Sequence, residues 1–166
     1  MIRVTEILPN WTGQVHDHVT LDYDARHRRR VALKGHHGLE FLLDLPKAVL
    51  LRGGDGLKLE DTRVVAVVAQ PEALMAVTAD SPEHLLRLAW HIGNRHLTAQ
   101  IDMTVEGDRI LIRHDHVIGH MLEHLGAKVA AVTLPFDPEG GAYGDAHQAH
   151  DHGSHDHGAE NHGHDH

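Results

Sequence analysis

Two helix-start signals in the second half of the chain constrain its fold more than any other feature. In the first, Ser81 can cap a helix, Pro82 takes the first helical position, and Glu83 lies near the positive end of the helix dipole. In the second, Asp115 precedes apolar residues at helical spacing that end at Gly126, a residue suited to the position just after a helix. Each signal predicts an amphipathic helix.

Strand-like segments surround these two helices. The candidate strands are residues 75–79, 100–105, 109–113 and 129–134. The middle two form an apparent hairpin, and Gly93 with Asn94 offers a stop for the first helix. The resulting order of strand, helix, strand, strand, helix and strand is the ferredoxin-like pattern. We therefore predict a ferredoxin-like βαββαβ domain over residues 71–136.

Residues 1–70 have a different pattern, with short apolar segments between turn-forming residues and no convincing helix. The candidate strands are residues 2–8, 19–23, 31–33, 39–44, 48–51, 57–60 and 64–69. Gly53-Gly54-Asp55-Gly56 marks a tight connection, and Pro71 marks the boundary with the next domain. Short strands without helices predict a small all-β domain over residues 1–70, so the fold class of the whole chain is α+β.

Composition excludes several classes of function. The chain has no cysteine, which removes thiolate metal sites and thiol nucleophiles. Its formal charge of −9 argues against nucleic acid as a partner. The basic run over residues 26–30 is interpreted as a solvated turn, with a phosphate site as the alternative. No apolar stretch approaches the roughly 20 residues of a membrane span, and the N-terminus lacks a signal-peptide core, so we expect a cytoplasmic protein.

Catalytic motifs are also missing from the sequence. It contains no phosphate-binding Gly-x-x-x-x-Gly-Lys loop, no Gly-x-Ser-x-Gly elbow and no His-Glu-x-x-His helix. The chemistry of the chain therefore depends on its imidazoles and carboxylates, and we expect a binding protein rather than an enzyme.

Histidine is the residue type that points to a function. Of the 20 histidines, eight fall in a segment almost without apolar residues, which predicts a disordered His/Asp-rich tail over residues 137–166. Tracts of this kind bind metal by composition, and the alternative is a purification tag or a passive solubilising tail. The composition does not select among nickel, copper and zinc. The candidate ligands in the tail are His147, His150, His152, His155, His157, His162, His164 and His166.

Three histidines of the folded part are candidate ligands. His96 lies near the end of the first predicted helix, where a lone histidine is more often a surface residue, unless a two-fold dimer supplies a second copy. His114 and His116 flank Asp115 at a strand-to-helix junction, and their rings could converge or diverge. His120 and His124 continue the spacing of His116 along one helical face; a chelating pair is possible, but a solvated polar face is favoured for these two.

Other histidine pairs are assigned ordinary structural roles. His16-Asp17-His18 and His36-His37 are interpreted as solvated loop residues of the first domain, and Trp90 needs only a packing explanation.

The residues also resemble a known family. Gly93-Asn94-Arg95-His96, then His114-Asp115-His116-Val117, then Leu134-Pro135-Phe136 and Gly141-Ala142-Tyr143 before a histidine-rich tail are similar to the urease accessory protein UreE family. Leu45-Pro46 and Leu51-Arg52-Gly53-Gly54-Asp55 extend the resemblance over essentially the whole chain.

The resemblance implies a nickel metallochaperone that delivers Ni(II) to the urease maturation complex for active-site assembly. It implies a homodimer with a nickel ligand at His96 of each subunit near the two-fold axis, a peripheral site at His114 and His116, and a tail that captures Ni(II). Zn(II) and Cu(II) are further candidate ions, and metal-dependent higher oligomers are possible. The implied partners are the urease accessory GTPase, other maturation proteins and, indirectly, apo-urease. The competing hypothesis is a general Zn/Cu/Ni buffer or storage protein.

Overall fold

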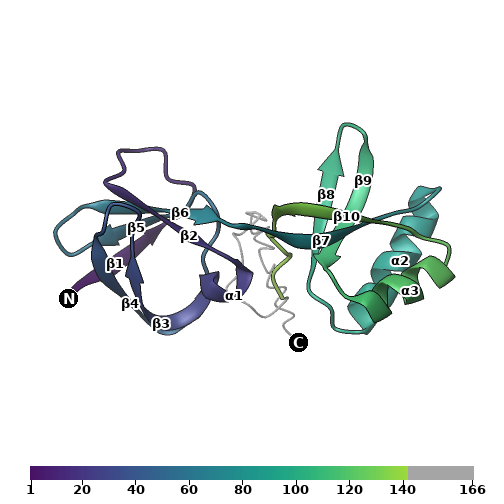
Figure 1. Cartoon of the computed structure of the whole chain (residues 1–166), viewed down its shortest axis with the longest axis horizontal. Helices are drawn as coiled ribbons and strands as arrows, with labels where there is room; N and C mark the ends of the chain where they lie inside the picture. The colour runs from purple at the N-terminus through teal and green to yellow at the C-terminus, as the bar shows by residue number, and fades with distance from the viewer. Residues whose placement is uncertain (142–166) are drawn as a thin grey trace, which may run out of the picture.

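The computed structural model describes residues 1–141, which form two β-rich units side by side, joined by the short step from the end of β6 to the start of β7 (Figure 1). The first unit is a six-stranded sheet, and the second is a four-stranded sheet with two helices. The predicted α+β class, with an all-β domain before a ferredoxin-like one, is confirmed. No helix within residues 1–141 is long and apolar enough to cross a bilayer.

The N-terminal sheet has an aliphatic interior. Its strands are β1 (Ile2–Leu8), β2 (Asp17–Leu21), β3 (His27–Lys34), β4 (Glu40–Leu50), β5 (Gly56–Leu59) and β6 (Val64–Ala69), in the spatial order β2-β6-β5-β1-β4-β3. β1 pairs with β4, and β2 with β6, in parallel, while the other pairs are antiparallel. Leucine and valine side chains from five of the strands, with Phe41, are buried between them.

Two local features of this domain differ from the prediction. A one-turn helix, α1 (Tyr23–Arg26), follows β2, and the carboxylate of Asp22 caps it by accepting a hydrogen bond from the Ala25 N–H at 2.8 Å. The two strands expected at residues 39–44 and 48–51 form one strand, β4. Pro46 lies inside it, where the register against β3 shifts. Proline has no N–H to donate, and it is tolerated at such a bulge because the regular hydrogen bonding between the strands is interrupted there.

The basic run over residues 26–30 is not the solvated turn that we predicted. Arg26 ends α1 and is fully buried, whereas residues 28–30 are exposed members of β3. The pattern was misread because charge normally indicates solvent, and burial of an arginine depends on acceptors supplied by distant segments.

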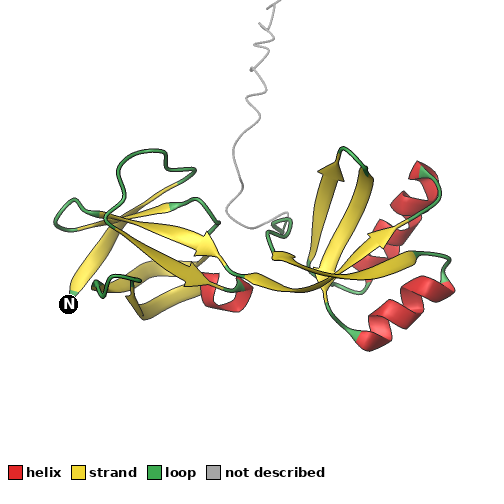
Figure 2. Cartoon of the chain, turned by 45° about the horizontal axis from the view of Figure 1, so that its top comes forward, coloured by secondary structure: helices red, strands yellow, loops and turns green. Residues whose placement is uncertain are grey.

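The C-terminal domain follows the predicted order of elements. These are β7 (Pro71–Thr78), α2 (Pro82–Asn94), β8 (Ala99–Thr104), β9 (Gly107–Arg113), α3 (His116–His124) and β10 (Lys128–Pro135). The strands form an antiparallel sheet in the order β10-β7-β9-β8, and both helices lie on one side of it (Figure 2). Ser81 caps α2, as predicted, by accepting a hydrogen bond from the His84 N–H at 3.1 Å. Asp115 caps α3, also as predicted, by accepting one from the Ile118 N–H at 3.0 Å.

The opposite face of this sheet meets the N-terminal domain through residues 136–139. Phe136 is buried beside Tyr23, with ring centroids 5.5 Å apart in an edge-to-face arrangement, and its carbonyl accepts a hydrogen bond from Arg26. Asp137 pairs with Arg52, and the Glu139 N–H bonds to the Ala99 carbonyl at 2.8 Å. Residues 137–139 are therefore held by both domains, although composition placed them in the tail. Composition cannot detect partners that the folded domains provide.

Candidate metal-binding sites

His96 lies just beyond α2 in a left-handed backbone conformation, with φ of 57°. Arg95 ends the helix, the His96 N–H bonds to the Gly93 carbonyl at 2.9 Å, and the Leu97 N–H bonds to the Ile92 carbonyl at 3.3 Å. This pair of bonds is the Schellman pattern, in which the residue after the cap adopts the left-handed conformation. The helix end therefore fixes the position from which the imidazole projects.

The first predicted helix does not stop before Gly93 and Asn94, so its predicted end is wrong. α2 includes both residues, and the left-handed position falls two residues later, on His96. α3 ends in the same pattern with Gly126, at φ of 87°, as predicted. A side chain in this conformation costs about 1 kcal/mol relative to glycine. The His96 ring is exposed and has no hydrogen-bond partner among residues 1–141, so no contact in this part of the chain offsets that cost.

An exposed apolar surface lies on α2, the helix that precedes His96. Leu86 and Trp90 stand four residues apart on one helical face, and 72% and 63% of their surfaces are exposed. Trp90 makes an edge-to-face contact with His91 but is not part of the core, so the packing role that we predicted for it is wrong. Large exposed apolar side chains that cluster in this way mark contact surfaces.

The His-Asp-His segment begins α3. Asp115 is the N-cap, while His114 continues from β9 through a hydrogen bond from its N–H to the Ala73 carbonyl at 3.2 Å. The sequence left open whether the His114 and His116 rings converge. Both residues line one shallow hollow of about 210 Å³ between α3 and the strands β7 and β10.

His120 lines the same hollow, and its ring lies against that of His116. The two Nε2 atoms are 3.3 Å apart, and the ring centroids are 4.6 Å apart at an interplanar angle of 88°. The i, i+4 spacing was visible in the sequence, but it could not distinguish this pair from the next one, His120 with His124. Within residues 1–141, no three histidine, aspartate or glutamate side chains are already gathered around one point.

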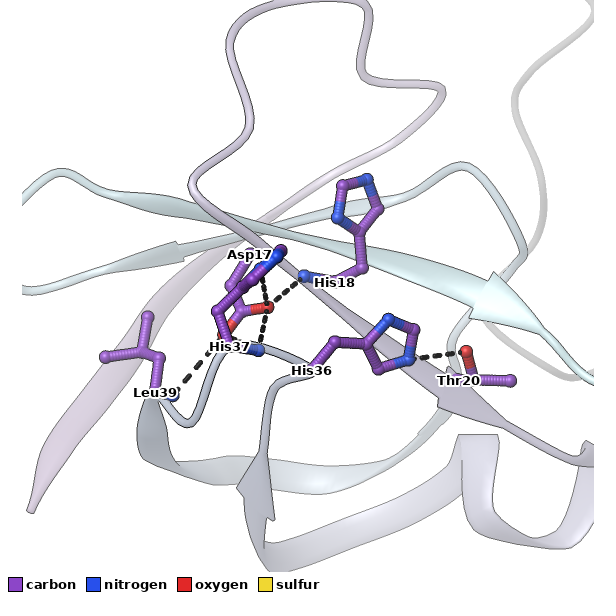
Figure 3. A network of polar contacts seen from close by, with 6 residues as sticks. All are labelled: Asp17, His18, Thr20, His36, His37 and Leu39. Atoms are coloured by element: carbon purple, nitrogen blue, oxygen red, sulfur yellow. Dashed lines mark hydrogen bonds and ion pairs between the residues drawn. The ribbon is translucent and has the colours of Figure 1, made fainter.

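Two histidines of the N-terminal domain, His18 and His37, contact a buried carboxylate (Figure 3). Asp17, only 1% exposed, accepts hydrogen bonds from the backbone N–H groups of His18, His37 and Leu39 and lies 3.1 Å from the His37 ring nitrogen. His18 is the second residue of β2 rather than a loop residue, but it and His36 and His37 are exposed, as predicted. The carboxylate therefore anchors the loop between β3 and β4.

Gly35 completes this anchor by allowing close approach. A Cβ atom at this position would lie 2.1 Å from the Asp17 Oδ2 atom, which no side chain could tolerate. Burial alone raises the pKa of Asp17, but the hydrogen bonds from His37, His18 and Leu39 outweigh it and lower the pKa from 3.8 to about 2. The loop is held by an ionised carboxylate, and this gives a prediction for stability.

We expect Asp17→Asn to lower the free energy of unfolding by about 2 kcal/mol at pH 7, because an amide nitrogen would face backbone N–H donors. Since the folded pKa is depressed, the carboxylate stabilises the fold fully above pH 4, and this contribution disappears as the pH falls toward 2. Urea denaturation of both proteins between pH 7 and pH 2 measures the difference.

The matched control is Asp61→Asn, which removes an exposed aspartate that also bonds to a backbone N–H, that of Arg63. We expect it to change stability by less than about 0.5 kcal/mol. A stability difference between the parent and Asp17→Asn that stays constant over the whole pH range would contradict the assignment.

The eight histidines of the predicted tail lie outside the described residues. So does the predicted disorder of residues 142–166. Their contribution to metal binding stays a prediction from composition.

Comparison with known proteins now adds to this geometry. The model of the UreE urease accessory protein N-terminal domain matches residues 4–70, and that of the C-terminal domain matches residues 72–166. The chain belongs to the UreE family. The resemblance found in its motifs is thereby confirmed. Membership of this family of accessory proteins supports a role of the chain in urease maturation.

Several similar proteins carry the same description. The chain is 55% identical to the urease accessory protein UreE of Chelativorans sp. (strain BNC1) over 92% of its own length and 90% of the relative's. It is 53% identical to that of Bradyrhizobium sp. (strain ORS 278), over 90% and 70% of the two lengths, and 48% identical to that of Rhodobacter capsulatus, over 92% and 94%. The similarity therefore extends through both domains.

Proposed function

We propose that this chain is a nickel metallochaperone, which binds Ni(II) through histidines and delivers it to the urease maturation complex for active-site assembly. The observation that carries the proposal is His96, an exposed imidazole on left-handed backbone at the end of α2. Neutral imidazole is a ligand that suits nickel, and the chain has no thiolate to compete for it. Family membership supports the role in urease maturation.

A homodimer makes His96 a workable nickel site. One imidazole holds a metal ion poorly, whereas a two-fold axis close to His96 supplies two. Exposed apolar side chains of the same domain support such an interface: Leu86 and Trp90 on α2, with Ile101 and Met103 on the edge strand β8. These residues give an isologous contact an apolar centre, with the metal ligands beside it.

The remaining histidines extend the capture of metal. The tail gathers Ni(II) from solution, and the hollow at His114 and His116 provides a peripheral site. Imidazole also suits zinc and copper, so these histidines bind Zn(II) and Cu(II) as well. The partners in delivery are the urease accessory GTPase and other maturation proteins in the cytoplasm, with apo-urease as the final acceptor. Metal-bridged higher oligomers follow from the same exposed ligands.

The alternative is a general Zn/Cu/Ni buffer, in which the tail performs the function and the folded part only displays it. It is tested in a full-length variant with the eight tail histidines replaced by asparagine, which we call the tail-silenced chain. We expect calorimetric titration and light scattering in the same solution to give one tightly bound Ni(II) per dimer. Loading apo-urease in the presence of the accessory proteins then measures delivery.

Two results would contradict the proposal. One tight nickel site per monomer would exclude a site shared across a two-fold axis. Complete loss of tight binding on silencing the tail, with no effect of the folded part on apo-urease, would favour the buffer.

A further inference from the structure

The contact between His116 and His120 has the geometry of a chelating pair. Two nitrogens bound to one tetrahedral ion, each at about 2.05 Å, lie about 3.3 Å from each other. The two Nε2 atoms on α3 are 3.3 Å apart. At right-angled coordination the same bond lengths require about 2.9 Å, so the observed spacing favours a tetrahedral ion.

The rings can present both nitrogens to a cation. In this contact one Nε2 donates its proton to the other, and the donor depends on the tautomer of each ring. Moving that proton to Nδ1 leaves both Nε2 atoms with a free lone pair, and a small rotation of the two rings would aim both lone pairs at one ion. The existing contact therefore holds two ligands at binding distance, and little side-chain order remains to be imposed when metal binds.

The surroundings of the pair suit a cation. Asp115 fixes the start of α3, so His116 and His120 lie one turn apart on a capped helix. Glu123 also lines the hollow, and no lysine or arginine of residues 1–141 does. The other lining residues, Met75, Gly119, Val129 and Ala131, carry no charge.

We infer that His116 and His120 form a second metal site, selective for ions of tetrahedral preference such as Zn(II) and Co(II), with His114 or Glu123 moving in as a third ligand. The inference rests on the proposed metal-handling role, but it changes the ligands: the pair along α3 replaces the pair His114 and His116 as the chelating unit. A tetrahedral site distinct from the dimer axis gives the protein a position that nickel does not compete for strongly, which separates zinc from the nickel cargo.

The test uses the tail-silenced full-length chain carrying His96→Gly, so that its outcome is independent of the interfacial nickel site. Zn(II) affinity is measured by competition with a chromogenic chelator, and Co(II) absorption reports the coordination geometry. We expect one Zn(II) per chain and the intense visible absorption of tetrahedral cobalt. His120→Gln should weaken zinc binding by more than about 100-fold, since even the loss of an outer-shell partner costs 10- to 100-fold.

His124→Gln is both the control and a safeguard. It should bind zinc as the parent does, because His124 takes no part in the contact at Nε2. His116→Gln is therefore made in the His124→Gln background, where His120 cannot find a new partner four residues further on. It should lose as much zinc affinity as His120→Gln does. Combining His116→Gln with His120→Gln should cost no more affinity than either substitution alone.

Three results would overturn the inference. The first is zinc affinity unchanged by His120→Gln. The second is a larger loss from His114→Gln than from His120→Gln, which would assign the site to His114 and His116. The third is the weak absorption of octahedral cobalt. Glutamine favours helix, and circular dichroism of each variant checks that α3 is retained.

Discussion

Replacing His96 with glycine removes tight nickel binding and leaves the chain at least as stable as the parent. The imidazole is the proposed ligand, so its loss from both subunits leaves the two-fold axis without donors. Glycine, however, adopts the left-handed conformation of this position without the cost that a side chain carries. Stability should rise by up to about 1 kcal/mol in the tail-silenced background.

Two matched variants separate the effect on binding from the effect on the backbone. His96→Ala also removes the ligand but keeps a Cβ on left-handed backbone, so it should lose nickel without gaining stability. His91→Ala removes another histidine from the last turn of α2, where the backbone is helical, and should keep nickel binding. Calorimetry measures nickel affinity, and thermal denaturation measures stability. Nickel bound tightly by His96→Gly would disprove the assignment of His96.

Replacing Arg26 with alanine should lower the free energy of unfolding by about 3–5 kcal/mol. The guanidinium is fully buried and donates to the carbonyls of Leu51, in the N-terminal domain, and Phe136, beyond the end of β10. Burial lowers the pKa of Arg26, and the carboxylates of Asp137 and Glu72 act in the opposite direction. Alanine would leave two buried carbonyls without donors and remove one of the contacts between the domains.

Arg28→Ala is the matched control, because Arg28 is an exposed residue of β3 two positions away. It should change stability by less than about 0.5 kcal/mol. Arg26→Lys keeps the charge but not the fork of donors, and an intermediate loss is expected. Urea denaturation measures stability, and hydrogen exchange at residues 136–139 reports the contact between domains. Faster exchange there without a loss of stability would show that the contact is not coupled to folding.

The sequence by itself determined the order of elements in the C-terminal domain and the family. Ser81, Asp115 and Gly126 act within one helical turn, through side chains and backbone angles that their own residue types supply. Short-range signals of this kind can be read without knowledge of distant segments. The same holds for the Gly93-Asn94-Arg95-His96 motif, which indicated the UreE family before any geometry was known.

Only the tertiary structure decided the roles of several polar residues. Arg26 is buried because Leu51 and Phe136, far away in the sequence, bring carbonyls to it. Asp17 is held at a pKa of about 2 by amides of a loop that the sheet folds against it. A charged side chain is stable in the interior only when such partners arrive, and a linear pattern does not specify them.

The histidines divide in the same way. Helical spacing made His116, His120 and His124 equivalent neighbours, and only the packing of α3 over β7 and β10 placed the first two around one hollow. His96 is a ligand candidate by sequence, but its left-handed backbone appeared only in the structure. Residue type and spacing determine which side chains can bind a metal, whereas the folded backbone decides which of them meet, because ligation requires nitrogens only a few ångströms apart.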